Sequence, residues 1–246
     1  MKILLVSGHT SGYNPSQATG VNEGDLNIEL VKLLRPRLEK YAEVTVYPYE
    51  RDLYQDNRHG KPQVNLAAFD YIFEVHFNGF DGKANGTGIY LDELYGGGTS
   101  VEQAVLKKIV ALGFKNRGIT RRGDLMNMRI ALSKGVDYAL LETCFFDNVA
   151  DMNRYKANKN KVADAITEGI AEAFGLKKVE TYTPWPAKII DAKELNVRET
   201  PNGKVVKTLQ AITVIGEEPD SDGDTWYKVQ LGDGTVGYIW PKYLSK

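Results

Sequence analysis

The 246-residue sequence contains a single cysteine and only three histidines. One cysteine excludes an internal disulfide, so the fold does not depend on an oxidising compartment. No apolar run approaches the roughly 20 residues that span a bilayer, which predicts that there is no membrane span. The 31 basic and 32 acidic residues leave a net charge of -1. Because nucleic-acid binders usually carry a basic excess or stripe, we expect no nucleic-acid partner.

The N-terminus leaves little room for a targeting segment. Met1 and Lys2 lead directly into an apolar, strand-like run over residues 3–6, without the apolar region and cleavage site of a signal peptide. We therefore expect the protein to be made in the cytoplasm without a signal peptide. A substrate outside the membrane would then require another route of export.

Two of the histidines and one glutamate lie where apolar, strand-like runs stop. His9 follows residues 3–6, His76 follows residues 71–75, and Glu142 follows residues 138–141. In an open α/β sheet the ends of neighbouring strands converge on one edge, where ligands bind. Imidazole and carboxylate are ligands that zinc accepts, so the pattern predicts a metal site. The third histidine, His59, lies in a polar, turn-rich stretch and is interpreted as a solvated loop residue.

Strand-like and helix-like stretches alternate up to about residue 175. Asn22 is a candidate N-cap for the first helix, and Pro36 should kink or end that helix. Strands separated by helices predict an α/β fold with a mainly parallel sheet and helices on both faces. The predicted strands are residues 2–7, 43–47, 71–76 and 137–142, and the predicted helices are residues 26–34, 99–111, 124–133 and 158–174.

The pattern changes towards the C-terminus. Residues 177–187 contain two prolines and no helical or strand period, which predicts a semi-rigid linker. Beyond the linker, short β-like runs separated by turns rich in Gly, Asn and Asp predict a small all-β barrel. The predicted organisation is therefore a first domain over residues 1–176, the linker, and a second domain over residues 188–246.

Segments of both predicted domains resemble known families. Gly8-His9 and residues 21–27, 75–78 and 140–148 resemble, in this order, motifs of the zinc-dependent N-acetylmuramoyl-L-alanine amidases of the amidase-3 family. Residues 195–198, 226–229, 237–239 and 243–244 resemble a bacterial SH3-type cell-wall-binding domain, which implies an SH3-like barrel. The combination of amidase and wall-binding domain resembles a bacteriophage endolysin.

The resemblance implies a chemistry and a place of action. It implies that His9, Glu23 and His76 bind one zinc ion per chain and that Glu142 is the catalytic carboxylate. The expected partner is bacterial peptidoglycan, cleaved at the amide bond between N-acetylmuramic acid and L-alanine. We expect a phage endolysin for host lysis, which reaches the wall after release through a holin-type membrane lesion. A bacterial autolysin of the same activity is the alternative, and the sequence predicts no oligomeric state.

Physical chemistry supports these roles to different degrees. A carboxylate near the start of a helix is already favoured by the helix dipole, so the position of Glu23 alone says little. A glutamate that ends an apolar run is costly without a purpose, and amide hydrolysis needs a group that moves a proton, which favours Glu142. Cys144 stands where the family usually has glycine. It is either a nucleophile or a small buried thiol, and the sequence leaves both interpretations open. A non-catalytic wall-binding protein would lack a ligand or the glutamate, and none is missing.

Candidate substrate contacts lie in both domains. Asn78 follows the second histidine motif, and Arg117 and Arg121 belong to a basic run that suits a substrate carboxylate or forms a solvated face. In the second domain, aromatic side chains line a groove for the peptide part of peptidoglycan or pack the core. These aromatic candidates are Trp226, Tyr227, Tyr238 and Trp240.

Overall fold

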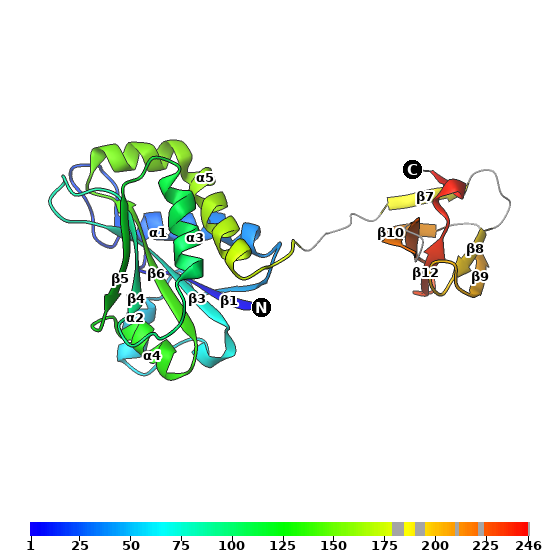
Figure 1. Cartoon of the computed structure of the whole chain (residues 1–246), viewed down its shortest axis with the longest axis horizontal. Helices are drawn as coiled ribbons and strands as arrows, with labels where there is room; N and C mark the ends of the chain where they lie inside the picture. Colours follow the sequence, from blue (N-terminus) through cyan, green and yellow to red (C-terminus); the bar gives the residue numbers. More distant parts are fainter. Residues whose placement is uncertain (179–184, 190–194, 210–211, 221–223, 246) are drawn as a thin grey trace. The chain divides into compact units, whose positions relative to one another are not determined.

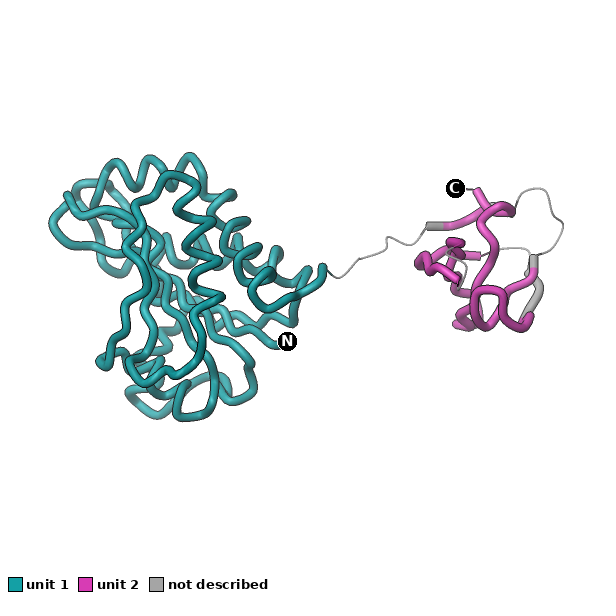
Figure 2. Tube along the Cα trace, in the orientation of Figure 1, with its two compact units in different colours: residues 1–179 teal, residues 180–246 magenta. Residues whose placement is uncertain are grey.

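The computed structural model describes residues 1–178, 185–189, 195–209, 212–220 and 224–245. The chain divides into two compact units, residues 1–179 and 180–246 (Figures 1 and 2). Residues 179–184 of the predicted linker 177–187 lie outside the described residues, and strand β7 (Trp185–Ile189) begins inside the predicted linker. The domain boundaries 1–176 and 188–246 stay predictions.

The first unit is built on a six-stranded sheet with the order β2-β1-β3-β6-β4-β5. All neighbouring strands are parallel except β4 and β6, which confirms the predicted mainly parallel sheet. The short β4 and the charged edge strand β5 were not predicted from the sequence. The strands are β1 (Lys2–Ser7), β2 (Glu43–Val46), β3 (Tyr71–Asn78), β4 (Thr87–Asp92), β5 (Asn116–Arg122) and β6 (Asp137–Phe145).

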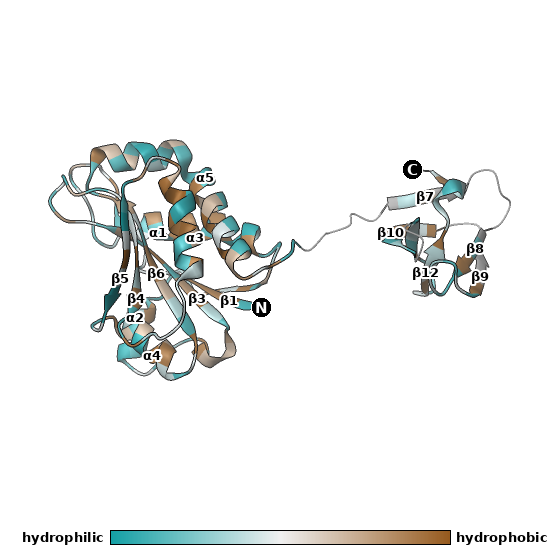
Figure 3. Cartoon of the chain, in the orientation of Figure 1, coloured by the Kyte–Doolittle hydropathy of each residue, from teal (hydrophilic) through white to brown (hydrophobic). Residues whose placement is uncertain are grey.

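Helices cover both faces of this sheet, as predicted (Figure 1). Side chains that alternate along β1 enter different apolar clusters, because successive residues of a strand point to opposite faces. Helices α1, α3 and α5 contribute to one cluster, and α2 and α4 contribute to the other. Figure 3 shows both hydrophobic and hydrophilic segments along α3 and α5. The helices are α1 (Glu23–Leu38), α2 (Leu53–Arg58), α3 (Ser100–Val110), α4 (Met126–Ser133) and α5 (Val149–Ala173), with a 3-10 turn η1 (Leu66–Ala68).

Helix α1 begins as predicted but does not end at Pro36. The Asp25 N–H donates to the Asn22 side chain at 2.9 Å, which confirms the predicted cap. Of the two predicted effects of Pro36, an end of the helix is wrong, because the helix continues to Leu38, and a kink stays a prediction. Leu38 is fully buried, and Arg37 donates to the Leu33 carbonyl, so tertiary and local contacts keep the last turn helical.

Helix α5 is longer than the predicted residues 158–174. It begins at Val149, where the side chain of Asn148 accepts the Asp151 N–H at 3.0 Å. Met152 and Tyr155 are buried in the same cluster as the later turns, so the additional turns belong to the core.

The second unit is an antiparallel sheet with the order β13-β7-β10-β11-β12-β8-β9, and its all-β class was predicted. Its small core includes the fully buried Val197, Val214 and Val229. Its remaining strands are β8 (Leu195–Arg198), β9 (Val205–Leu209), β10 (Ile212–Pro219), β11 (Thr225–Gln230), β12 (Val236–Ile239) and β13 (Leu244–Ser245), with a 3-10 turn η2 (Pro241–Tyr243). Among the described residues of both units, no helix combines the length and apolar character needed to cross a membrane.

Candidate metal centre

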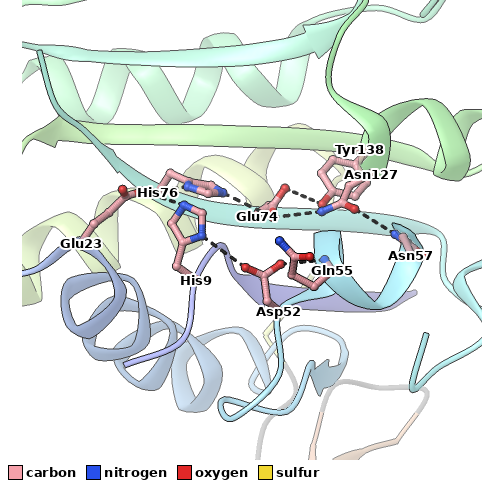
Figure 4. A network of polar contacts seen from close by, with 9 residues as sticks. All are labelled: His9, Glu23, Asp52, Gln55, Asn57, Glu74, His76, Asn127 and Tyr138. Carbon is pink, nitrogen blue, oxygen red and sulfur yellow. Dashed lines mark hydrogen bonds and ion pairs between the residues drawn. The ribbon is translucent and has the colours of Figure 1, made fainter. Parts of the chain in front are cut away.

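Three of the predicted site residues converge at one edge of the first unit's sheet. His9 follows β1, Glu23 is the first residue of α1, and His76 lies near the end of β3 (Figure 4). Their candidate ligand atoms all lie within 4.8 Å of one another. The Oε1 atom of Glu23 is 2.9 Å from Nδ1 of His76 and 3.7 Å from Nε2 of His9. These three side chains can hold a metal ion.

The donor set fits zinc in its chemistry, and the two separations that involve Glu23 also fit in length. Two imidazoles and one carboxylate match the three protein ligands of many catalytic zinc sites. Zinc bonds to such ligands measure about 2.0–2.2 Å, so two ligand atoms of one ion lie at most about 4.4 Å apart. The separations of 2.9 and 3.7 Å about Glu23 fall within this limit.

Gly8 lets the ring of His76 reach this position. The Gly8 N–H donates to the Val75 carbonyl at 2.9 Å and so continues the parallel pairing of β1 with β3. A Cβ atom at Gly8 would lie 2.0 Å from Cε1 and Nε2 of His76. No side chain at this position is compatible with the observed ring, so the glycine is required by the close approach.

The charges of Glu23 and His76 support one another. Burial alone raises the pKa of Glu23, but hydrogen bonding to His76 and the charges of His76 and His9 bring the pKa below its usual value. Burial alone lowers the pKa of His76, but contacts with Glu23 and Glu74 and the charge of Glu142 raise it well above its usual value. The carboxylates around His76 therefore favour a positive charge at this position.

Glu142 lies on β6 directly opposite His76 in the parallel register. Its Oε2 atom is buried and has no hydrogen-bond partner among the described residues. Burial, together with the charges of Glu23 and Glu74, raises the pKa of Glu142 to about 7, although His76 and Arg122 act in the opposite direction. A carboxyl group with such a pKa can both accept and release a proton near neutral pH.

Two further carboxylates that the sequence did not reveal lie beside the histidines. The Asp52 carboxylate is 3.4 Å from Nδ1 of His9, and the Glu74 carboxylate is 3.4 Å from Nε2 of His76. The contact of Asp52 with His9 could not be predicted, because the two residues are 43 positions apart in the chain. Strand periodicity places residues 74 and 76 of β3 on the same face, but the contact between Glu74 and His76 was not predicted.

A cavity of about 270 Å³ opens beside this group. One wall is apolar, and the lining also includes both histidines and the two additional carboxylates. The apolar part is formed by Leu125, Met126, Met128 and Leu140.

The other candidate contacts of the first unit lie elsewhere. Arg117 stacks over Phe145, with its guanidinium carbon 4.9 Å from the ring centroid. Arg121 donates to the Tyr95 carbonyl. The Asn78 carbonyl accepts the Phe146 N–H at 2.8 Å. None of Asn78, Arg117 and Arg121 is among the described residues that line the cavity, so their role in substrate binding stays a prediction.

In the second unit, the aromatic candidates differ in environment. Trp226 is buried, and its indole N–H donates to Asp220 at 3.0 Å. Trp240 packs edge-on against Trp226, and Tyr227 packs against the core. Tyr238 donates its hydroxyl hydrogen to Glu218 at 2.7 Å. Packing thus accounts for Trp226 and Tyr227, and ligand binding by any of the four stays a prediction.

Cys144 is a fully buried residue of β6. Burial, together with the charge of Asp151, raises the pKa of its thiol well above the usual value. A nucleophilic cysteine must be a thiolate, which requires a lowered pKa and access to substrate. This environment is that of a small core residue.

Comparisons with known proteins agree with both units. Residues 3–172 match the protein family described as N-acetylmuramoyl-L-alanine amidase, and residues 193–245 match the bacterial SH3 domain. A Staphylococcus aureus protein described as probable autolysin PH is 27% identical over an alignment of 195 residues, and the match covers 69% of this chain and 38% of that protein. An endolysin of Bacillus phage SPP1 is 28% identical over an alignment of 181 residues, and the match covers 72% of this chain and 67% of the endolysin.

Solved structures show the same fold for the first unit. The catalytic domain of an endolysin targeting Clostridia difficile is 25% identical to this chain, with a TM-score of 0.58. The match covers 70% of this chain and 97% of that domain. An N-acetylmuramoyl-L-alanine amidase from Clostridium difficile 630 is 19% identical to this chain, with a TM-score of 0.60. The match covers 71% of this chain and 96% of that protein. At this lower identity the likeness shows the fold alone.

Proposed function

Because the chain belongs to the N-acetylmuramoyl-L-alanine amidase family through residues 3–172, we propose that it hydrolyses the amide bond between N-acetylmuramic acid and L-alanine in peptidoglycan. The observation that carries this proposal is the convergence of His9, Glu23 and His76, whose ligand atoms lie within 4.8 Å, next to Glu142. Three protein ligands are typical of a catalytic zinc site, and a nearby carboxylate can transfer the proton that amide hydrolysis requires.

An amide is a poor electrophile with a poor leaving group. Hydrolysis therefore needs a polarised carbonyl, an activated water molecule and a proton for the departing amine. One zinc ion per chain, held by His9, Glu23 and His76, would supply Lewis-acid polarisation and lower the pKa of water towards about 7.

Glu142 is proposed to move the proton. In the metal-free protein, burial raises the pKa of this carboxyl group to about 7, so its protonated form is accessible near neutral pH. In its ionised form it accepts a proton from the attacking water, and in its neutral form it donates a proton to the amine nitrogen. The absence of a hydrogen bond to its Oε2 among the described residues leaves that atom available for this exchange.

The second unit is proposed to bind the bacterial cell wall, as a bacterial SH3 domain joined to an amidase. A tethered binding domain raises the local concentration of the catalytic domain at an insoluble substrate. We favour a phage endolysin that acts on the wall after release from the host cytoplasm, because the matched endolysin shares more of its length with this chain than the autolysin does. A bacterial autolysin would have the same chemistry.

Digestion of purified peptidoglycan tests the proposed activity. Mass spectrometry should find free L-alanine amino termini on stem peptides and intact glycan strands, and metal analysis should find one zinc per chain. A chelator should abolish the reaction and added zinc should restore it. Cleavage of a glycosidic or peptide bond instead, or full activity in metal-free protein, would overturn the proposal.

A further inference from the structure

Glu74 is a buried carboxylate that lies beside the ligand group, which consists of His9, Glu23 and His76, and does not belong to that group. Glu74 is 3% exposed and lies two residues before His76 on β3, on the same face of the strand. Its Oε1 atom is 3.4 Å from Nε2 of His76, whereas Nδ1 of the same ring is 2.9 Å from Glu23. Figure 4 shows His76 between these two carboxylates.

Three polar side chains hold Glu74 in place. The Tyr138 hydroxyl donates to Oε2 of Glu74 at 2.6 Å, and the Asn127 amide donates to Oε1 at 3.3 Å. Asn127 in turn accepts a hydrogen bond from the Asn57 amide at 2.9 Å. A buried carboxylate is costly unless it is hydrogen-bonded, and this network both satisfies Glu74 and determines its orientation.

His9 has the reverse arrangement. Its Nε2 atom is 3.7 Å from Glu23, whereas its Nδ1 atom is 3.4 Å from Asp52. The Asp52 carboxylate is itself held, because it caps α2 by accepting the Gln55 N–H at 3.1 Å. Each histidine thus has one nitrogen directed at Glu23 and the other directed at an anchored carboxylate.

We infer that Glu74 is a positioning residue that selects which nitrogen of His76 binds the metal. It accepts the Nε2–H of His76 and leaves Nδ1 as the ligand atom, whereas Asp52 accepts the Nδ1–H of His9 and leaves Nε2 as the ligand atom. A carboxylate partner of this kind fixes the tautomer and the ring orientation and makes the imidazole a stronger donor. This inference rests on the metal-binding part of the proposed function.

The zinc affinity of a Glu74→Gln variant of the full chain tests the role of Glu74. Glutamine keeps the size and the hydrogen bond with Tyr138 but removes the charge. Competition with a chromophoric chelator should show zinc binding weakened by about 10–100-fold. Unfolding of the metal-free proteins, followed by circular dichroism, should confirm that the variant is folded.

Glu102→Gln is the matched control. Glu102 lies on α3, is also 3% exposed, and also accepts a hydrogen bond from a buried tyrosine, Tyr71, at 3.1 Å. It is not part of the ligand group. Its variant should keep the zinc affinity of the unchanged protein. Equal zinc affinities for the Glu74 variant and the unchanged protein would overturn the inference.

The tautomers give a second test that needs no variant. In zinc-loaded protein with nitrogen-15-labelled histidine, NMR should show His76 protonated at Nε2 and His9 protonated at Nδ1. Exposed His59, next to the C-terminal end of α2, serves as an internal reference. The same tautomer for His76 and His9 would overturn the inference. Failure of the unchanged protein to bind zinc would overturn both the proposed function and this inference. Zinc binding with the same tautomer at both histidines would overturn only the inference.

Discussion

At the scale of single residues, the site depends on how closely side chains approach one another. The ring of His76 occupies the space beside Gly8. A Cβ atom added at Gly8 would lie 2.0 Å from this ring. The Glu142 carboxyl group is buried opposite His76 and has no hydrogen bond to its Oε2 among the described residues. Small changes at these two positions should therefore affect metal binding and proton transfer separately.

Gly8→Ala should displace His76 and weaken zinc binding by at least about 10-fold, because the added Cβ would lie 2.0 Å from the ring and the ring must leave its position. Gly98→Ala is the control, since an added Cβ there meets no atom within 4 Å. Zinc affinity measured for both variants checks this prediction. Normal affinity of the Gly8 variant would show that the ring occupies another position in the zinc-loaded protein.

Glu142→Gln should keep zinc but lower the rate of hydrolysis by at least about 10²–10⁴-fold, because glutamine has the size of glutamate and cannot carry the proton. Metal analysis and turnover of soluble muropeptides measure the two properties on one sample. A variant with near-normal turnover would assign the proton transfer to another group.

The same variant should change the pH dependence of stability in the metal-free protein. Since the pKa of Glu142 is raised from 4.5 to about 7, its contribution to the free energy of unfolding is fully present below pH 4.5 and is lost as the pH rises through about 7. Glutamine has no such loss. Denaturant unfolding with a chelator at pH 5 and pH 8 should therefore show Glu142→Gln gaining stability relative to the unchanged protein at the higher pH. A difference that is independent of pH would contradict the raised pKa.

At the scale of elements, the ends of strands and helices bring the ligands together. Strands β1 and β3 are parallel neighbours, so the residues that follow or end them meet at one edge. Helix α1 presents Glu23 in its first position because Asn22 caps it at that point. The start of the helix and the position of the candidate ligand Glu23 are thus determined by the same side chain.

Asn22→Ala should lower the free energy of unfolding by about 1 kcal/mol and also weaken zinc binding, because fraying of the first turn moves Glu23. Asn148→Ala is the matched control, since Asn148 caps α5 in the same way but is not followed by a ligand. Its variant should lose comparable stability and keep its zinc affinity. Equal loss of zinc affinity in both variants would mean that general destabilisation, and not the position of Glu23, is responsible.

At the scale of the whole molecule, the chain consists of two units with separate cores. The first unit contains the metal-ligand group, and the apolar cluster of the second unit contains only residues of that unit. A domain with its own core is able to fold alone. Catalysis and wall binding should therefore be separable.

A truncated chain of residues 1–178 should fold, bind zinc and cleave small soluble muropeptides at a rate similar to that of the full chain. It should no longer sediment with cell walls and should lose much of its lytic activity on intact cells, because the local concentration effect is lost. Sedimentation and turnover assays measure these two properties. Loss of turnover on soluble fragments with wall binding preserved would show that the second unit is part of the active site.

The sequence by itself determined the class of each unit and predicted that His9, His76 and Glu142 lie at strand ends, whereas Glu23 was predicted only from the family resemblance. Apolar runs that end at His9, His76 and Glu142 are local patterns, and the period of each run identifies a strand whose end lies at a sheet edge. The cap at Asn22 is local as well. The edge strand β5 escaped prediction because its charged sequence, Asn116–Arg122, has no apolar alternation.

Only the tertiary structure decided which nitrogen of each histidine faces Glu23 and which side chains support the rings. The contact of Glu74 with Tyr138 joins residues 64 positions apart, and that of His9 with Asp52 joins residues 43 positions apart. Such contacts depend on strand order, register and the path of connecting segments. Because hydrophobic periodicity specifies which face of a strand is buried but not which strand lies beside it, these partners become visible only when the sheet is assembled.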